Sequence, residues 1–398
     1  MESKEINLHA IHYATGEPVS ICLEQGMIRS IEPIKSETRG TSELAIVAPG
    51  LVDLQINGYA GHDFNHMPYA DKLVGEVIRK LWQEGVTSCF PTVITNSDQA
   101  IQEALEFIAF ACRQDAAADQ GIAGIHLEGP FISAHDGARG AHDLKYVKPP
   151  DWELFTRWQE ASGGRIRIVT LSPEWPDSAK FIAKCTESGV TVSIGHTSAT
   201  PEQICEAVEA GARMSTHLGN GAHLMMPRHP NYIWEQLAQD RLWSSVIADG
   251  FHLPDQVLKV VFKVKGAQAM LVSDAVSLSG LPAGAYTTHI GGSVVLTPEG
   301  KLHLAEDENL LAGSAHMLLQ GIEHVTNRGL ADLAEAWDMA SVRPSSCMKL
   351  PSSSGLTPGA PADLVLFRRA GSRIRLERTF KSGKEVFVRE DLLSNFSS

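Results

Sequence analysis

The stretch VTVSIGHTSATPEQICEAVEAGARMSTHLGN, residues 190–220, decides which fold the sequence predicts. It begins with a short apolar run over 190–195, typical of a buried strand, which ends at His196. A helical pattern follows, and a second short strand over 214–216 ends at His217. The stretch therefore has the order strand, helix, strand.

The start of the helix between these strands is strongly marked. Thr200 is the expected N-cap, Pro201 the first helical residue and Gln203 the partner that closes a capping box. A parallel βαβ unit built this way brings His196 and His217 side by side at the carboxyl ends of neighbouring strands. Imidazole is the commonest nitrogen ligand for a transition metal, although a polar residue at a strand end can equally serve as a cap or turn residue.

Bulk properties describe an acidic globular protein. The chain has 398 residues, 43% of them apolar, which is enough for a large barrel and a smaller domain. The formal charge of -13, with no basic run, argues against nucleic-acid binding. A charged local pocket could still bind an anionic substrate.

The sequence predicts a cytoplasmic protein without a membrane segment. Its first residues, MESKEINLHA, lack the apolar core of a signal peptide, and no apolar stretch is long enough to span a bilayer. Six cysteines without CxxC spacing are expected to be reduced thiols: Cys22, Cys89, Cys112, Cys185, Cys205 and Cys347.

Alternation of strands and helices predicts a (β/α)₈ TIM barrel of the α/β class. Eight short apolar runs are its expected strands: 50–56, 87–93, 123–127, 166–171, 191–195, 214–216, 245–248 and 269–272. Helical patterns lie between them at 71–84, 98–113, 177–188, 202–210 and 255–265. The sixth strand is the shortest and has the weakest signal.

Both ends of the chain have β patterns without a helical period. Residues 1–48 and 351–398 are therefore expected to form one small β-sandwich domain, with the barrel over 49–350. A glycine-rich excursion with β-like pieces, 277–309, interrupts the barrel after its eighth strand.

Polar residues recur where the predicted barrel strands end, which is where barrel enzymes place their chemistry. Glu128, His196 and His217 form a His₂-carboxylate set that suits a catalytic zinc with an open position for water. Each has an ordinary alternative, since Glu128 could form a salt bridge and each histidine could be a satisfied core residue. Their joint occurrence at corresponding strand ends favours the metal site.

Asp274 follows the eighth strand, opposite the expected ligands. An aspartate there can take a proton from an activated water and return it to a leaving group. The alternative is a helix N-cap, for which aspartate is also favoured.

Several segments together resemble the N-acetylglucosamine-6-phosphate deacetylases of the amidohydrolase superfamily, from near residue 5 to near residue 390. These segments are APGLVDLQING (48–58), HLEGPF (126–131), GHT (195–197), THL (216–218), ADGFH (248–252), SDA (273–275) and LAGS (311–314). Their order and spacing are specific, whereas the ending GAPADLV (359–365) is shared by many amidohydrolases.

The resemblance implies roles for individual residues. Glu128, His196 and His217 would bind one divalent metal ion per subunit, with zinc expected and Fe²⁺ or another divalent ion as alternatives. Asp274 would be the general base and acid, and His142 would contact the sugar and position the amide. Without the resemblance, His142 would be taken for an exposed loop histidine.

The resemblance also implies a site for a phosphorylated amino sugar. Gln55, Asn220 and Gly221 would contact the substrate, and Arg228 and His252 would bind its phosphate, for which a guanidinium fork is suited. In the family this arginine reaches the neighbouring subunit's site, so a homodimer is expected. On the sequence alone, Arg228 would be read as a solvated surface charge.

Two departures from the family pattern matter. Gln55-Ile56-Asn57 replaces the His-x-His that supports a second metal in many amidohydrolases, so a mononuclear site is expected. Gly219 replaces an aromatic residue before Asn220, which leaves the sugar epimer and the need for the phosphate open.

The expected function is hydrolysis of N-acetylglucosamine 6-phosphate to glucosamine 6-phosphate and acetate. The alternatives are an amidohydrolase acting on N-acetylgalactosamine 6-phosphate or an unphosphorylated sugar, and a non-catalytic barrel used for binding.

Overall fold

A barrel of eight parallel strands forms the centre of the computed structural model, which describes residues 5–34, 44–70 and 72–393. Its strands are β5 (Leu51–Ile56), β8 (Val86–Ile94), β9 (Ile125–Glu128), β10 (Ile166–Leu171), β11 (Thr191–Ile194), β12 (Met214–Ser215), β13 (Trp243–Val246) and β14 (Ala269–Leu271). They pair in chain order from β5 to β14. The predicted TIM barrel is confirmed.

The barrel closes just beyond its last strand. Ile56 and Ala275 form a parallel bridge, and the Asp274 N–H donates to the Gln55 carbonyl at 2.9 Å. The two ends of the sheet are thereby joined next to the residues expected to act in catalysis. Apolar side chains fill the interior, among them Val52, Leu54, Phe90, Ile168, Met214, Ile247, Met270 and Val272.

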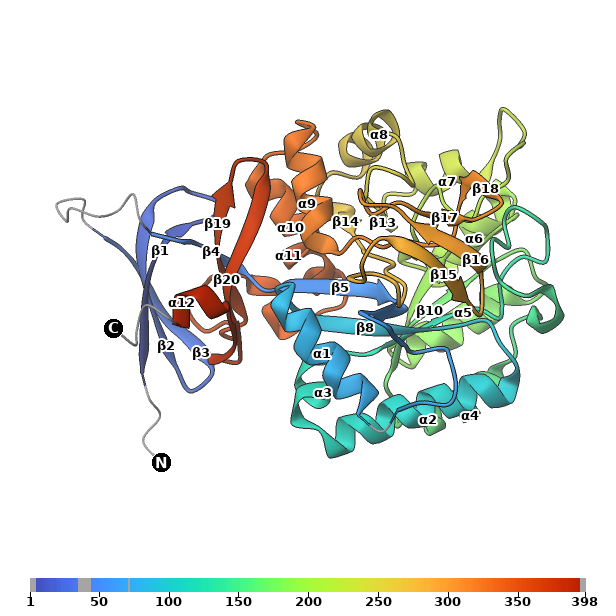
Figure 1. Cartoon of the computed structure of the whole chain (residues 1–398). Coiled ribbons are helices and arrows are strands. Elements are labelled where there is room, and N and C mark those ends of the chain that lie inside the picture. The colour runs from blue at the N-terminus through green and yellow to red at the C-terminus, as the bar shows by residue number, and fades with distance from the viewer. Residues whose placement is uncertain (1–4, 35–43, 71, 394–398) are drawn as a thin grey trace.

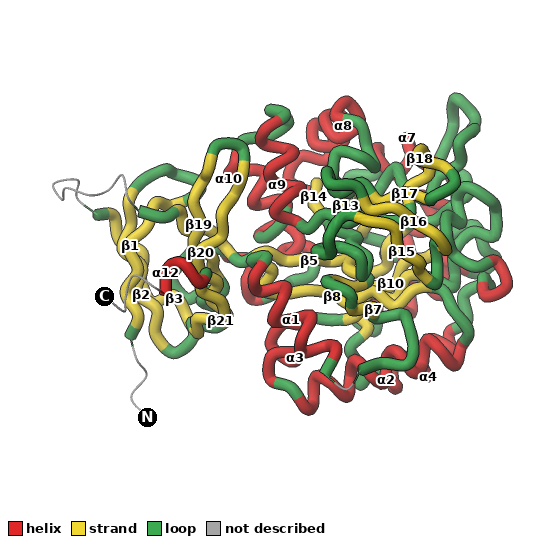
Figure 2. The backbone as a smooth tube through the Cα atoms, viewed as in Figure 1, coloured by secondary structure: helices red, strands yellow, loops and turns green. Residues whose placement is uncertain are grey.

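Helices surround these strands, as Figure 2 shows. They are α1 (Leu73–Gln83), α2 (Asp98–Gln114), α3 (Ala116–Gly121), α4 (Trp152–Ala161), α5 (Ser178–Glu187), α6 (Pro201–Ala210), α7 (Tyr232–Ala238), α8 (Asp255–Lys265), α9 (Leu318–Asn327), α10 (Leu333–Met339) and α11 (Val342–Cys347). The capping box of Thr200 and Gln203 is formed. The expected helix start at Asp71 lies outside the described residues.

A separate sheet domain is built from both ends of the chain and lies beside the barrel (Figure 1). Its strands are β1 (Ile6–His12), β2 (Pro18–Glu24), β3 (Met27–Pro33), β4 (Ile46–Pro49), β19 (Leu364–Ala370), β20 (Arg373–Lys381) and β21 (Lys384–Val388). They form one seven-stranded sheet, in which β4 joins the N-terminal strands to β19. Residues 1–4, 35–43 and 394–398 of the predicted β domain lie outside the described residues.

The excursion after the barrel forms a four-stranded antiparallel sheet. Its strands are β15 (Gly284–Thr288), β16 (Gly292–Leu296), β17 (Leu302–Leu304) and β18 (Asp307–Leu311). Val294, Leu296 and Leu302 give this sheet a small apolar cluster of its own. The remaining elements are short: β6 (Gly58–Tyr59), β7 (His62–Asp63), the 3₁₀ turns η2 (Leu144–Tyr146), η3 (Gly266–Gln268) and η4 (Pro351–Ser354), and α12 (Glu390–Leu393).

Two expectations about covalent and membrane features can be compared with the structure. All six cysteines are free thiols. Within the parts of the chain that the structure describes, every helix is too short or too polar to cross a membrane.

Buried polar contacts hold the sheet domain to the barrel. The Lys381 ammonium of β20 donates to Asp363 at 2.7 Å and to Ser88 of β8 at 3.1 Å, and its side chain is 9% exposed. Trp337 of α10 stacks on Phe367 of β19 with the ring centroids 4.5 Å apart. The ion pair between Lys381 and Asp363 is shielded from water, so removing either charge would leave the other buried without compensation.

Lys381→Met should destabilise the protein because it leaves the Asp363 carboxylate buried without its cation. The free energy of unfolding in urea is expected to fall by about 3 to 5 kcal/mol. Lys180→Met is the matched control, since Lys180 pairs with Asp177 at a site where both side chains are more than two-thirds exposed (79% and 71%). The control should change stability by less than about 1 kcal/mol, and equal losses in both variants would contradict the role given to Lys381.

Candidate active site

The carboxyl ends of neighbouring strands bring the predicted site residues to one mouth of the barrel. Glu128 is the last residue of β9, and His196 and His217 each lie two residues beyond the ends of β11 and β12. Gln55 lies near the end of β5, and Asp274 follows β14. Parallel pairing places all these ends on the same side of the sheet.

Three of these residues have a left-handed backbone that the sequence did not predict. The φ angles are 48° at His196, 29° at His217 and 47° at Asp274. Such values are uncommon outside glycine and cost about 1 to 3 kcal/mol each. The strain lies just beyond the point where each of these strands ends.

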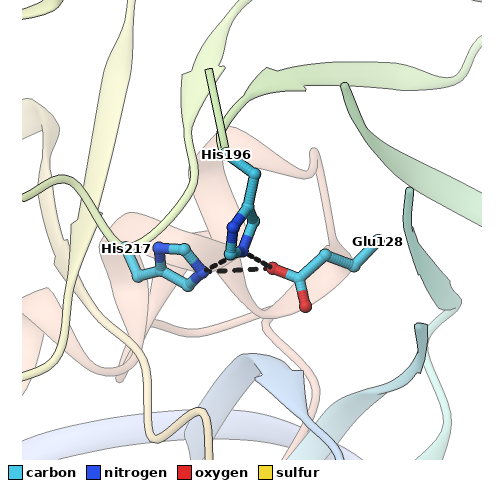
Figure 3. A group of neighbouring side chains, drawn as sticks. All are labelled: Glu128, His196 and His217. Carbon is cyan, nitrogen blue, oxygen red and sulfur yellow. Dashed lines mark hydrogen bonds and ion pairs between the residues drawn. The ribbon is translucent and has the colours of Figure 1, made fainter. Parts of the chain in front are cut away.

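Glu128, His196 and His217 form a compact triangle of ligand atoms (Figure 3). Nε2 of His217 lies 3.1 Å from Oε1 of Glu128 and 3.1 Å from Nε2 of His196, and the remaining side is 3.4 Å. A divalent ion about 2 Å from each atom fits a triangle of this size. The three side chains are buried, so bulk water cannot hydrate their donor atoms or screen their charge.

Surrounding contacts orient these donors. Nδ1 of His196 faces the Ala138 carbonyl at 3.0 Å, so its proton lies there and the Nε2 lone pair is directed into the triangle. The Gln55 amide donates to Oε1 of Glu128 at 2.8 Å. Nδ1 of His217 is a buried atom without a hydrogen-bond partner among the described residues.

The charges in the triangle also suit a cation. Burial alone would raise the pKa of Glu128, but its contacts with His196 and His217 hold that pKa well below its usual range. Burial opposes the charge of His217, yet the hydrogen bond to Glu128 leaves the pKa of the imidazole raised. Both shifts show that positive charge is favoured among these three atoms, and a metal ion bound there would compete with protons for them.

Asp274 lies at the mouth of the barrel just after β14, where no helix begins in the described part of the chain. Burial raises its pKa to about 6, a value suited to proton exchange near neutrality. The amide of Asn57 donates to its Oδ1 at 2.7 Å. The next α-helix along the described chain, α9, begins only at Leu318, so the N-cap alternative is excluded.

His142 lies within this cluster, although its loop position gave no such indication by itself. Its side chain is buried, and Nε2 lies 3.3 Å from Nε2 of His196. Burial, followed by repulsion from His196, lowers the pKa of His142 to about 3, so the ring is neutral. A neutral imidazole here can donate one hydrogen bond toward a substrate.

The turn after His217 packs directly against the site. The Asn220 amide donates to the His217 carbonyl at 3.3 Å. A Cβ added at Gly221 would lie 2.6 Å from Nδ1 of His196, and Gly221 has a φ of 57°, so glycine is required there for two independent reasons.

The two residues expected to bind phosphate differ in their surroundings. Nδ1 of His252 lies 2.6 Å from the Asp249 carboxylate, which also accepts hydrogen bonds from the backbone N–H groups of Phe251 and His252. Although burial works to raise the pKa of Asp249, the hydrogen bond with His252 holds it lowered. Arg228 is exposed on the loop before α7, outside the contacts that join the other site residues.

Two supporting residues have contacts that the sequence did not predict. Asn57 bears in the sequence only on the number of metal ions, through Gln55-Ile56-Asn57, and Asp249 is only one letter of the segment ADGFH. Their contacts with Asp274 and His252 show that each orients a predicted site residue. Asn57 lies two positions after Gln55, and that spacing was the available signal, since alternate residues of a strand face the same side.

The comparisons with known proteins match this geometry. Residues 46–386 match the model of the Amidohydrolase family. The chain belongs to the amidohydrolase family. The match includes every residue of the candidate site.

Relatives of this amidohydrolase include sugar-phosphate deacetylases. The N-acetylglucosamine-6-phosphate deacetylase of Lysinibacillus sphaericus is 31% identical over 378 residues, covering 92% of this chain and 93% of the relative. The N-acetylgalactosamine-6-phosphate deacetylase of Shewanella sp. (strain ANA-3) is 31% identical over 323 residues, covering 79% and 77%. The resemblance inferred from the sequence segments is confirmed.

Solved structures agree with the fold. The N-acetyl-D-glucosamine-6-phosphate deacetylase from Mycobacterium smegmatis superposes with a TM-score of 0.84 at 25% identity, covering 96% of this chain and all of that chain.

The raised pKa of Asp274 predicts a pH-dependent stability difference in the metal-free amidohydrolase. The folded protein keeps a proton on Asp274 up to about pH 6, whereas the unfolded chain loses it near its ordinary value of 3.8. The contribution of Asp274 to the free energy of unfolding therefore falls as the pH rises from about 4 to about 6. Asp274→Asn should therefore gain stability relative to wild type, by up to about 3 kcal/mol, between pH 4 and pH 7. Urea denaturation of both metal-free proteins measures this difference, and a difference independent of pH would contradict the raised pKa.

Proposed function

We propose that this amidohydrolase hydrolyses N-acetylglucosamine 6-phosphate to glucosamine 6-phosphate and acetate. The observation that carries the proposal is the joint placement of Asp274, His142 and the Glu128–His196–His217 triangle at one barrel mouth. Its relatives include deacetylases of this substrate. A non-catalytic barrel has no need for a buried carboxylate among three imidazoles.

Glu128, His196 and His217 would hold one divalent metal ion, with zinc as the preferred ion and Fe²⁺ as an alternative. Two imidazoles and one carboxylate are a common zinc set in catalytic sites. When bound, such an ion supplies Lewis acidity that makes a water more acidic and polarises the amide carbonyl. Gln55 and Asn57 in place of two histidines support a single ion per site.

Asp274 performs the proton transfers. It accepts a proton from the water that attacks the acetamide carbonyl, and it returns that proton to the departing amine. The hydrogen bond from Asn57 fixes one of its oxygens and leaves the other for this exchange. His142 donates to the carbonyl oxygen as negative charge develops on it.

The sugar phosphate would be bound by residues around the mouth. Gln55, Asn220 and Gly221 contact the sugar, and His252 binds the phosphate from the same subunit. Arg228 is exposed and outside the cluster, which supports the proposal that it serves the site of a second copy in a homodimer.

Two related substrates remain as alternatives. The first alternative is N-acetylgalactosamine 6-phosphate, because the Shewanella deacetylase named for that substrate has the same sequence identity to this chain as the Lysinibacillus N-acetylglucosamine-6-phosphate deacetylase. The second alternative is an unphosphorylated N-acetyl sugar. The acidic net charge and the absence of a basic run favour a small-molecule partner over nucleic acid. The proposed location is the cytoplasm.

A panel of four sugars tests the proposed function. Acetate release is measured from N-acetylglucosamine and N-acetylgalactosamine, each with and without the 6-phosphate. The highest kcat/KM is expected for N-acetylglucosamine 6-phosphate. No acetate from any of the four, with metal supplied, would overturn the proposal.

Asp274→Asn should separate metal binding from turnover. The three proposed ligands are unchanged, so metal content by mass spectrometry should stay within about twofold of wild type. Because the amide cannot accept the proton, kcat should fall by about 10³-fold or more. Wild-type turnover in this variant would remove Asp274 from the mechanism.

Arg228→Ala should weaken binding of the phosphorylated sugar by about tenfold or more while leaving the unphosphorylated sugar unaffected. The arrangement across subunits can be tested by mixing. Arg228→Ala and Asp274→Asn proteins, co-expressed so that mixed dimers form, should regain activity, because one site per mixed dimer then has both wild-type residues. Absence of any recovery would place Arg228 in its own subunit's site or outside the site.

A further inference from the structure

A chain of hydrogen bonds crosses the barrel interior directly beneath the proposed metal ligands. Nε2 of His126 lies 2.7 Å from the Thr170 hydroxyl, which lies 2.7 Å from the Thr216 hydroxyl. The Thr216 hydroxyl in turn lies 2.5 Å from that of Ser193. At the other end, Nδ1 of His126 lies 3.0 Å from the Leu54 carbonyl. All these side chains are almost completely buried, which shields the bonds from bulk solvent.

The direction of the chain follows from its ends. A carbonyl can only accept, so the single proton of a neutral His126 ring lies on Nδ1 and Nε2 must accept. Thr170 therefore donates to His126, and its oxygen is left to accept from Thr216. By the same step Ser193 donates to Thr216. Each hydroxyl has one proton, and each proton has one acceptor, so the bonds support one another.

Gly195 makes the central bond possible. A Cβ added there would lie 2.7 Å from Cβ of Thr216 and 2.9 Å from Cγ2 of Thr170. Strand β11 lies between β10 and β12, so the two threonine side chains can meet only across a residue that lacks a side chain. Gly195 is thus required for packing, because it leaves room for the two threonine side chains, and not for an unusual backbone conformation.

Three members of the chain, His126, Ser193 and Thr216, lie one to three residues before a proposed ligand, and Thr170 lies beside Glu128 on the neighbouring strand. His126 lies two residues before Glu128 and faces the same side of β9. Thr170 is the register partner of Glu128 on the neighbouring strand. Thr216 directly precedes His217, and Gly195 directly precedes His196. Movement of one hydroxyl would therefore be transmitted to the base of all three ligands.

We propose that the Ser193–Thr216–Thr170–His126 chain positions Glu128, His196 and His217, and that its hydroxyls determine how tightly the site binds a divalent metal. The proposal rests on the proposed metal-binding function. These four are positioning residues, since they act through the ligands and do not reach the substrate.

Metal affinity of the metal-free protein is the quantity that tests this role. The dissociation constant for Zn²⁺ is measured by competition with a chromogenic chelator in wild type, Thr170→Val and Thr170→Ser. Valine keeps the volume but leaves Nε2 of His126 without a donor and the proton of the Thr216 hydroxyl without an acceptor. We expect the affinity to weaken by about 10- to 100-fold in Thr170→Val and to return to within about threefold of wild type in Thr170→Ser.

Thr379→Val is the matched control. Thr379 is also fully buried and donates to the Trp82 carbonyl at 2.7 Å, but it lies on β20 of the sheet domain. This control should lower the melting temperature of the metal-free protein while leaving the zinc affinity unchanged. Ser193→Ala is a milder variant that removes only the terminal donor, and it replaces Thr170→Val if that variant fails to fold. It should weaken zinc binding by about threefold.

The outcomes separate the two proposals. Wild-type zinc affinity in Thr170→Val and Ser193→Ala, with tight binding by wild type, would overturn the positioning role and leave the proposed function intact. Failure of wild type to bind any divalent metal would overturn the proposed function and the positioning role with it. The positioning role would also be overturned if Thr170→Val and Thr170→Ser weakened zinc binding equally, because serine restores the hydroxyl.

Discussion

Three ligand atoms held about 3 Å apart inside a barrel mouth are the constraint on which this site depends. Nε2 of His196, Nε2 of His217 and Oε1 of Glu128 are all electron-rich, and burial removes the water that would otherwise separate them. Such an arrangement is favourable only around a cation or a shared proton. Parallel strands that end on the same side provide the spacing: β11 and β12 are neighbours about 4.8 Å apart, and β10 alone separates β9 from β11. The barrel's closure at Ile56 and Ala275 then brings Asp274 to face the triangle.

Much of the fold could be predicted because its signals are local. Apolar runs separated by helical patterns identified all eight strands, even the two-residue β12, and the start of α6 at Thr200 was readable from its capping residues. The ligand set followed because strand ends in a parallel barrel converge. The left-handed φ values at His196 and His217 could not be predicted, since they result from tertiary constraints that override the local preference of histidine.

Longer-range contacts account for the rest of what the sequence did not reveal. The burial of His142 depends on how the loop after β9 packs on His196, which no periodic pattern encodes. Asn57 meets Asp274 only because the barrel closes there. Gly219 shows the reverse case: a departure noticed in the sequence has a structural reason, because its φ is 96° and a Cβ would lie 2.9 Å from Leu253. An aromatic side chain at this position would require a different turn.

The central claim is that one divalent ion lies among Glu128, His196 and His217. Anomalous X-ray diffraction at the zinc edge, from crystals of protein loaded with zinc, tests it most directly. The account predicts a single strong peak per chain, within about 2.3 Å of Nε2 of both histidines and of Oε1 of Glu128. A peak bound by other residues, or none at this triangle in fully loaded protein, would contradict it.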